Sequence, residues 1–117
     1  PDIQEMFKKL KVAEYQVIVI TDGGNGAYAY SGKQYYKCPV YDAPVVSTLG
    51  AGDAFASTFC ATLAKTDIDI CKSLMYASVN SAGVCSQFGA TQGLLTFEEI
   101  EQKLKETPDY TCKVINA

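Results

Sequence analysis

The sequence predicts an α/β fold, a class in which helices pack against a β-sheet, and three observations support this class. Residues 17–20 (Val-Ile-Val-Ile) are all β-branched and do not alternate with polar residues, as expected for a strand buried on both faces of a parallel sheet. A segment with helical apolar spacing precedes this strand, and two longer helical segments follow it. Helices that flank a strand in this order typically cover the faces of one sheet.

Turn residues and tyrosines predict a hairpin after the first strand. Residues 21–26 include three glycines and an asparagine, which together are a strong signal for a reversal of the chain. Residues 27–30 and 34–38 are short, rich in tyrosine and separated by a Ser-Gly-Lys turn, so we expect two paired strands. The tyrosines favour a half-buried antiparallel edge over a ligand-binding surface, because aromatic residues prefer such positions even without a ligand.

Three helices are expected in the second half of the chain. Residues 52–63 are apolar on nearly every side, which indicates a central helix. A second long helix is expected from about residue 68 to 87, with Gly89 suited to the left-handed position after its end. Thr96 and Glu99 form the pattern of a capping box and predict the start of a third helix.

Four shorter segments complete the expected order. Residues 3–10 have apolar side chains at spacings of three and four, which predicts a short helix with Asp2 as its cap. Residues 39–44 are expected to cross irregularly to a last short strand at 45–46. The tail at 110–115 is compatible with an added strand or with a frayed end.

Length and composition favour one globular domain. The chain has 117 residues, of which 48% are apolar and 20% charged, and no apolar run approaches the ~20 residues of a membrane span. The net charge of −3 argues against a nucleic-acid partner. Because the chain begins with Pro-Asp-Ile and shows no targeting segment, we expect a fragment of a longer protein.

The cysteines fit neither a disulfide framework nor a zinc site. There are five, an odd number, without a Cys-x-x-Cys pair and without any histidine. A reducing cytosol is therefore the simplest location for the protein. Cys60, Cys71 and Cys85 fall in the expected helices, where we expect small buried hydrophobic side chains rather than reactive thiols.

A glycine-bearing turn within residues 47–55 leads directly into the first long helix of the second half. Gly50, Ala51 and Gly52 place almost no side chain in front of the backbone, so their N–H groups can approach an anion at the positive end of the helix dipole. Asp53 lies in the first turn, where it can cap a backbone N–H or accept a proton from a substrate hydroxyl. From these residues alone, an anion site and a purely structural turn both stay open.

The sequence Gly-Ala-Gly-Asp, followed by an aromatic residue and a run of small residues at 54–59, resembles the second signature of the ribokinase (pfkB) family of carbohydrate and nucleoside kinases. The resemblance implies a ribokinase-like layered α/β/α fold, of which residues 1–117 would be the C-terminal nucleotide-binding part, without the N-terminal substrate part and lid. It also implies ATP-dependent phosphoryl transfer to a primary hydroxyl, with Asp53 as the general base and the amides of residues 50–52 as the anion hole. No glycine is followed by the Lys-Ser or Lys-Thr pair of a Walker-type site.

The same resemblance implies a nucleotide-binding role for the loop after the first strand. Family members have there a threonine and a glycine-bearing loop that lines the nucleotide, and Asp22 departs from the apolar residue expected after the threonine. One position of the second long helix contacts the adenine. The register places Ser78 there, whereas the asparagine of this helix is Asn80. The implied nucleotide-binding residues are Thr21, Gly23, Gly24, Asn25, Gly26, Gly52 and Ser78.

Metal ions are the second implication of the resemblance. Many family members hold potassium beside the anion hole through an aspartate at the position of Ser47, and this chain lacks that carboxylate. A weak monovalent-cation site would comprise Ser47, Leu49, Val84, Gln87 and Gly89. Mg²⁺ is expected to arrive with ATP, since the chain shows no dedicated carboxylate cluster and the family's Asn-x-x-Glu element is expected before Pro1.

The expected protein is thus a cytoplasmic kinase whose partners are ATP and a small sugar or nucleoside, with no nucleic acid and no membrane. A homodimer is an option for the complete protein, and the 117-residue chain by itself is expected to be inactive. Two alternatives stay open: a nucleotide-binding or regulatory module that performs no transfer, and a structural fragment without a ligand.

Overall fold

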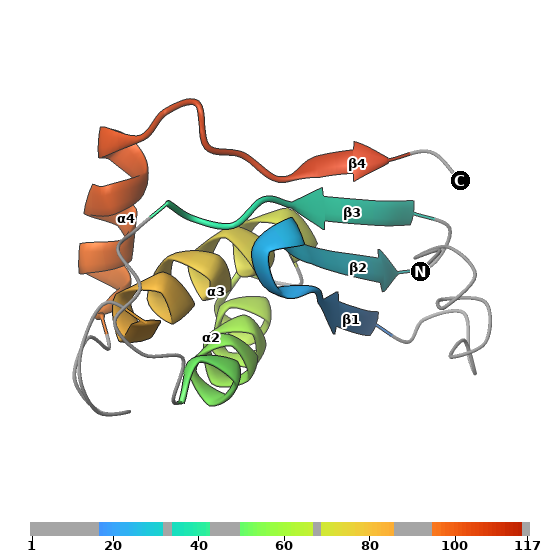
Figure 1. Cartoon of the computed structure of the whole chain (residues 1–117), viewed down its shortest axis with the longest axis horizontal. Coiled ribbons are helices and arrows are strands. Elements are labelled where there is room, and N and C mark those ends of the chain that lie inside the picture. Colours follow the sequence, from blue (N-terminus) through green and yellow to red (C-terminus); the bar gives the residue numbers. More distant parts are fainter. Residues whose placement is uncertain (1–16, 32–33, 43–49, 67–68, 86–94, 116–117) are drawn as a thin grey trace.

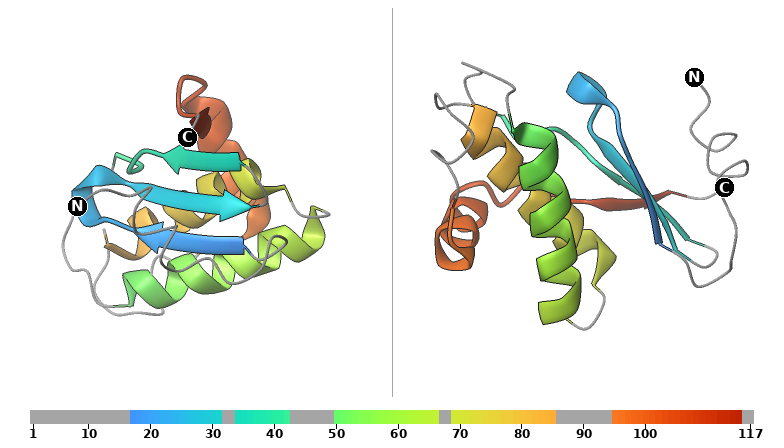
Figure 2. Two further views of the ribbon diagram at one scale, coloured as in Figure 1. Left: turned by 90° about the vertical axis from the view of Figure 1, so that its right-hand side faces the viewer. Right: turned by 90° about the horizontal axis from the view of Figure 1, so that it is seen from below.

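The computed structural model describes residues 17–31, 34–42, 50–66, 69–85 and 95–115. In these ranges the chain forms two layers, with a sheet on one side and helices on the other (Figure 1, Figure 2). The elements follow one another as β1 (Val17–Thr21), the 3-10 turn η1 (Gly23–Asn25), β2 (Ala27–Ser31), β3 (Gln34–Cys38), α2 (Ala51–Lys65), α3 (Ile70–Cys85), α4 (Phe97–Glu106) and β4 (Lys113–Ile115).

The sheet has the order β1-β2-β3-β4, and each of these pairings is antiparallel. The predicted strand at 17–20 is present in β1, but the prediction of a parallel strand buried on both faces is wrong for the pairing described here. Val17 to Ile20 are only half-buried, and β1 pairs with β2. The short loop between β1 and β2 is the physical reason, because a parallel pair needs a crossover of about a dozen residues or more.

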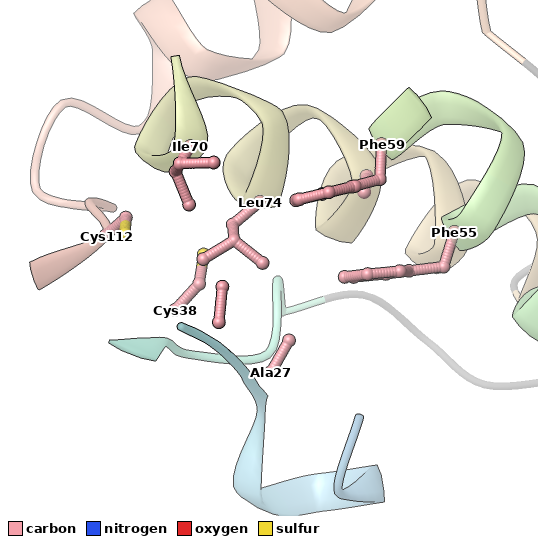
Figure 3. Packing of buried hydrophobic residues seen from close by; sticks show 9 residues of the cluster. Ala27, Cys38, Phe55, Phe59, Ile70, Leu74 and Cys112 are labelled. Atoms are coloured by element: carbon pink, nitrogen blue, oxygen red, sulfur yellow. The ribbon is translucent and has the colours of Figure 1, made fainter. Parts of the chain in front are cut away.

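Side chains from both layers form the main core. Ala27 and Ala29 of β2 belong to one buried cluster with residues of the helices. Figure 3 shows Ala27 on the side of the sheet that faces Phe55 of α2 and Leu74 of α3. The small side chains of β2 allow the helices to approach the sheet closely, and Phe55 and Phe59 stack with their ring centroids 6.4 Å apart. This packing fixes the start of α2 relative to the loop that connects β1 to β2.

The predicted hairpin is confirmed, since β2 pairs with β3 with Ser31 opposite Gln34. Successive residues of a strand point to opposite faces. Tyr30 and Tyr35 accordingly lie on the sheet face away from the main core, with their rings 4.8 Å apart, and form a second buried cluster. The tyrosines of the hairpin therefore contribute to packing.

The first two long helices begin and end close to the predicted residues, but α2 is not apolar and buried on every side. Its buried residues lie on one face, whereas Ala56 and Cys60 are exposed. The expectation that Cys60 is a buried hydrophobic residue is wrong. A helix rich in alanine reads as apolar all round, yet alanine gains little from burial and tolerates an exposed position.

The helix α4 starts at the predicted capping box. The Glu99 backbone N–H donates to Thr96 Oγ1 at 3.1 Å, and the Thr96 backbone N–H donates to Glu99 Oε1 at 2.9 Å. Of the two alternatives for the tail, the added strand is present, because β4 pairs with β3 with Val114 opposite Tyr36. The predicted helix at 3–10, the strand at 45–46 and the cap at Gly89 lie outside the described residues. Within those ranges no helix has the length and apolar character that a membrane span needs.

Candidate active site

A pocket of about 500 Å³ lies where the loop after β1, the start of α2 and the second half of α3 come together. Most of the residues that the sequence singled out for nucleotide binding line this pocket, although they come from three separate segments. The lining comprises Thr21, Gly23, Gly24, Gly26, Ala27, Val40, Tyr41, Asp42, Ala51, Gly52, Phe55, Ser78, Ser81, Ala82 and Cys85. Asn25 and Asp53 are exposed and are not among these lining residues.

The loop at residues 21–26 is held by its own backbone. The Asp22 N–H donates to the Gly26 carbonyl at 2.8 Å, and the Asn25 N–H donates to the Asp22 carbonyl at 2.9 Å. The Asn25 side-chain amide donates to Asp22 Oδ2 at 3.3 Å. Asp22, which departs from the family pattern, therefore acts as an internal partner of the loop.

The glycines of this loop differ in what the fold requires of them. Gly26 has φ +97°, and a Cβ placed on it would lie 2.4 Å from the Cys38 carbonyl oxygen, so the hairpin itself requires glycine there. Gly23 has φ +48° with free space around it. Gly24 has neither a positive φ nor a neighbour within 4 Å, so its lack of a side chain leaves the loop backbone open to the pocket.

The start of α2 forms the second side of the pocket. Gly50 is the N-cap residue with φ 80°, a left-handed conformation that favours glycine, and its carbonyl accepts the first helical bond from the Ala54 N–H at 3.0 Å. A Cβ on Gly52 would meet no protein atom within 4 Å, so it would project into open space at the pocket wall. The pocket lining contains no lysine or arginine, and an anion there would depend on backbone N–H groups and on the helix dipole.

Asp53 lies in the first turn of α2 and is exposed. No side-chain hydrogen bond caps the start of this helix, and the Asp53 carboxylate forms no hydrogen bond to another residue in the described ranges. The capping role, which the sequence left open, therefore has no contact to support it. The carboxylate remains available to a group that arrives from solvent or from a ligand.

Ser78 of α3 lies at the pocket wall but its hydroxyl points to a neighbour in the sheet. The side chain is 8% exposed, and Oγ donates to Cys38 Sγ at 3.7 Å. Cys38 Sγ also lies 3.2 Å from the Tyr110 hydroxyl. Burial is the main cause that raises the pKa of both Cys38 and Tyr110, so this cluster stays neutral at physiological pH. An adenine contact by Ser78 would compete with the bond to Cys38.

Asn80, the asparagine of the same helix, does not line the pocket. Its side-chain amide donates to Thr58 Oγ1 at 2.8 Å, and its Oδ1 accepts the Leu95 N–H at 2.9 Å. The residue is 6% exposed and joins α2, α3 and the segment before α4. Its role in the described structure is to satisfy buried polar groups.

Several lining residues were not predicted as site residues. Ser81 and Ala82 had a signal in the sequence, because small residues at this spacing let a ligand approach the helix, and Ser81 Oγ donates to the Ala51 carbonyl at 3.3 Å. Tyr41 had no such signal. Its hydroxyl donates to the Lys103 carbonyl at 3.2 Å, and its ring meets Tyr110 edge-on at 5.0 Å. These contacts come from residues more than 60 positions away, which local patterns do not show.

The structure describes one of the five residues proposed for a monovalent cation. Val84 is fully buried in α3 and does not line the pocket. Ser47, Leu49, Gln87 and Gly89 lie outside the described residues. In the described ranges no three His, Cys, Asp or Glu side chains gather in a group that could hold a metal ion.

Comparison with known proteins identifies the class. The family model for pfkB carbohydrate kinases matches residues 1–96, and the chain therefore belongs to this family. The ribokinase-like fold class predicted from the sequence is confirmed by solved structures of the same class. One of them is a candidate ribokinase II from E. coli in complex with ATP and Mg²⁺, with a TM-score of 0.71 and 25% identity, matched over 78% of this chain and 29% of that chain.

Two curated relatives are more similar in sequence. The chain is 36% identical over 90 residues to a 5-dehydro-2-deoxygluconokinase of Bacillus subtilis (strain 168), which covers 76% of this chain and 27% of the relative. It is 32% identical over 110 residues to a ribokinase of Lactococcus lactis subsp. lactis (strain IL1403), which covers 90% of this chain and 36% of the relative. The chain thus spans about a third of the length of these relatives.

Proposed function

We propose that this chain forms the nucleotide-binding part of a kinase that transfers the γ-phosphoryl group of ATP to a primary hydroxyl of a sugar or nucleoside. The observation that supports the proposal most is the single pocket shared by the loop after β1 and the start of α2. It joins a glycine-bearing loop to a helix N-terminus, which is a suitable place for a polyphosphate. The E. coli relative solved with ATP and Mg²⁺ agrees with this ligand class.

In the proposed reaction Asp53 accepts the proton of the substrate hydroxyl, and the hydroxyl oxygen attacks the γ-phosphorus as the bond to ADP breaks. The exposed position of Asp53 and its lack of a described hydrogen-bond partner support this role. The N–H groups of Gly50, Ala51 and Gly52 are proposed to stabilise the charge on the transferring group. The phosphates would lie against these amides, and the rest of the nucleotide against the loop and α3.

The residues proposed to bind the nucleotide are those named from the sequence, but the structure supports them to different degrees. Thr21, Gly23, Gly24, Gly26 and Gly52 line the pocket. Asn25 is proposed to act through the shape of the loop, because its side chain bonds to Asp22. Ser78 is proposed to border the adenine, with its hydroxyl held by Cys38.

Magnesium is proposed to enter with the nucleotide, where it would neutralise phosphate charge. The described residues do not fit a protein-held divalent site, since they include no suitable cluster of ligands.

A serine at position 47 adds no full charge, so we expect activity in potassium to differ little from activity in a bulky organic cation. Initial rates in the two salts check this, and strong activation by potassium would contradict it.

The proposed substrate class rests on the curated relatives and on the share of their length that the chain spans. The curated relatives are a deoxygluconokinase and a ribokinase, so we propose a sugar acceptor first and a nucleoside second. Because the chain spans about a third of their length, the acceptor site and any dimer interface are proposed to lie outside it, and the 117-residue chain alone is proposed to be inactive.

Phosphoryl transfer from labelled ATP to a panel of sugars and nucleosides tests the proposal, with binding of ATP measured in parallel on the complete protein. Transfer to one class of acceptor would support the kinase. Binding of ATP without transfer to any acceptor would instead favour the alternative of a nucleotide-binding or regulatory module. Absence of binding would overturn both.

A further inference from the structure

Two cysteines that are far apart in the sequence meet at the end of α3 opposite the pocket. Cys71 lies in the first turn of α3, and Cys112 directly precedes β4. Their sulfur atoms are 2.7 Å apart. The fold therefore places two thiols in direct contact across 41 positions of sequence, although the cysteine pattern gave no indication of a pair.

The two thiols differ in their exposure. Cys112 is 8% exposed and belongs to the main core cluster, at whose edge it lies in Figure 3. Cys71 is half-buried and is the more exposed residue of the two. Burial, followed by the hydrogen bond with Cys71, raises the pKa of Cys112. The more exposed Cys71 is therefore the thiol that meets a small-molecule disulfide first. The buried Cys112 lies in contact with the Cys71 sulfur, where it can resolve a mixed disulfide.

We propose that Cys71 and Cys112 form a reversible disulfide when the protein meets a small-molecule disulfide such as oxidised glutathione. The Cys71 thiolate attacks one sulfur of the oxidant, which releases one glutathione thiol and leaves a mixed disulfide on Cys71. The Cys112 thiol then loses its proton, and its sulfur attacks the Cys71 sulfur and releases the second glutathione thiol. Two protein thiols are oxidised, one glutathione disulfide is reduced, and the two protons pass to the glutathione thiols.

The cross-link would tie α3 to a segment that supports the pocket wall. Tyr110, two residues before Cys112, donates its hydroxyl to the Pro39 carbonyl and contacts the ring of Tyr41. Closing a loop of about 40 residues also restricts the unfolded chain, which stabilises the folded state. We therefore expect oxidation to raise the melting temperature by about 5 °C or more, in a way that reducing agent reverses.

The test is oxidation of the protein with oxidised glutathione, followed by non-reducing peptide mapping by mass spectrometry and by a thermal melt. We expect one cross-linked peptide that joins Cys71 to Cys112, with a mass lowered by two hydrogen atoms. Cys71→Ser and Cys112→Ser should each lose the cross-link and the rise in melting temperature. Cys60→Ser is the matched control, because Cys60 is exposed on α2, and it should retain both.

Three results would overturn the proposal: glutathione that stays on Cys71 without a cross-link, a cross-link that involves another cysteine, or a cross-link between Cys71 and Cys112 without a rise in melting temperature. The mapping on the unmodified sequence needs no variant, so a variant that folds poorly does not prevent the test. Neither readout depends on kinase activity.

Discussion

The two sides of the pocket contain similar residues but are held in different ways. The loop at residues 21–26 is closed by backbone hydrogen bonds. Only glycine fits at position 26, because the Cys38 carbonyl leaves no room for a side chain. The start of α2 is open, since a Cβ on Gly52 would meet no described protein atom within 4 Å and the Asp53 carboxylate has no hydrogen-bond partner in the described ranges. A glycine that a neighbour requires belongs to the fold, whereas the packing of the described residues does not require glycine in free space at the pocket wall.

The largest expected effect is a loss of turnover, caused by a change at the start of α2, the open side of the pocket. Asp53→Asn should lower turnover by about 10² to 10⁴-fold, because an amide cannot act as a general base. The melting temperature should stay close to that of the parent, since asparagine caps a helix about as well as aspartate. Steady-state kinetics, ATP affinity and a thermal melt on the complete protein check this. Near-normal turnover would show that Asp53 is not the base.

On the closed side the expected effect is on stability. Gly26→Ala should destabilise the protein by about 1–3 kcal/mol, because the new Cβ would lie 2.4 Å from the Cys38 carbonyl oxygen at a φ of +97°. Gly24→Ala is the matched control, since it meets nothing within 4 Å, and its free energy of unfolding should change little. Chemical denaturation measures both. Equal destabilisation by the two changes would remove the distinction between the two glycines.

A smaller effect is expected from filling the open side of the pocket. Gly52→Val should weaken ATP binding by about tenfold, or ~1.4 kcal/mol, because its side chain would enter the space next to the backbone amides. The Cβ of the new side chain would meet no described protein atom within 4 Å, so the folded state should persist. Titration calorimetry with ATP checks the affinity, and unchanged binding would place the phosphates elsewhere.

The smallest effect is expected from removing a side-chain hydrogen bond in the loop at residues 21–26, because backbone hydrogen bonds already hold this loop. Asp22→Ala removes one exposed hydrogen bond of 3.3 Å with Asn25 and leaves the backbone bonds of the loop in place. We expect a loss of stability below ~0.5 kcal/mol and little change in ATP affinity. If chemical denaturation showed a loss of several kcal/mol in the free energy of unfolding, the side chain rather than the backbone would determine the conformation of the loop.

Much of the candidate site could be predicted from the sequence because its residues act locally. The turn at residues 50–53 and the loop at 21–26 have compositions that define their own backbone shape. Ala51 and Gly52 of the turn and the three glycines of the loop line the pocket. Ser78 was assigned to the nucleotide by the resemblance of its helix to the family pattern, but the partner of its hydroxyl could not be foreseen. That partner, Cys38, lies 40 positions earlier in the chain.

The sequence by itself determined the features whose interactions lie within a few residues. The capping box of Thr96 and Glu99, the hairpin and the start of α2 are of this kind. Only the tertiary structure decided the antiparallel pairing of β1, the exposure of Cys60, the place of Tyr41 on the pocket and the contact between Cys71 and Cys112. These features depend on which distant segments pack together, and packing is governed by the shape and total area of whole faces, which no short pattern of residues specifies.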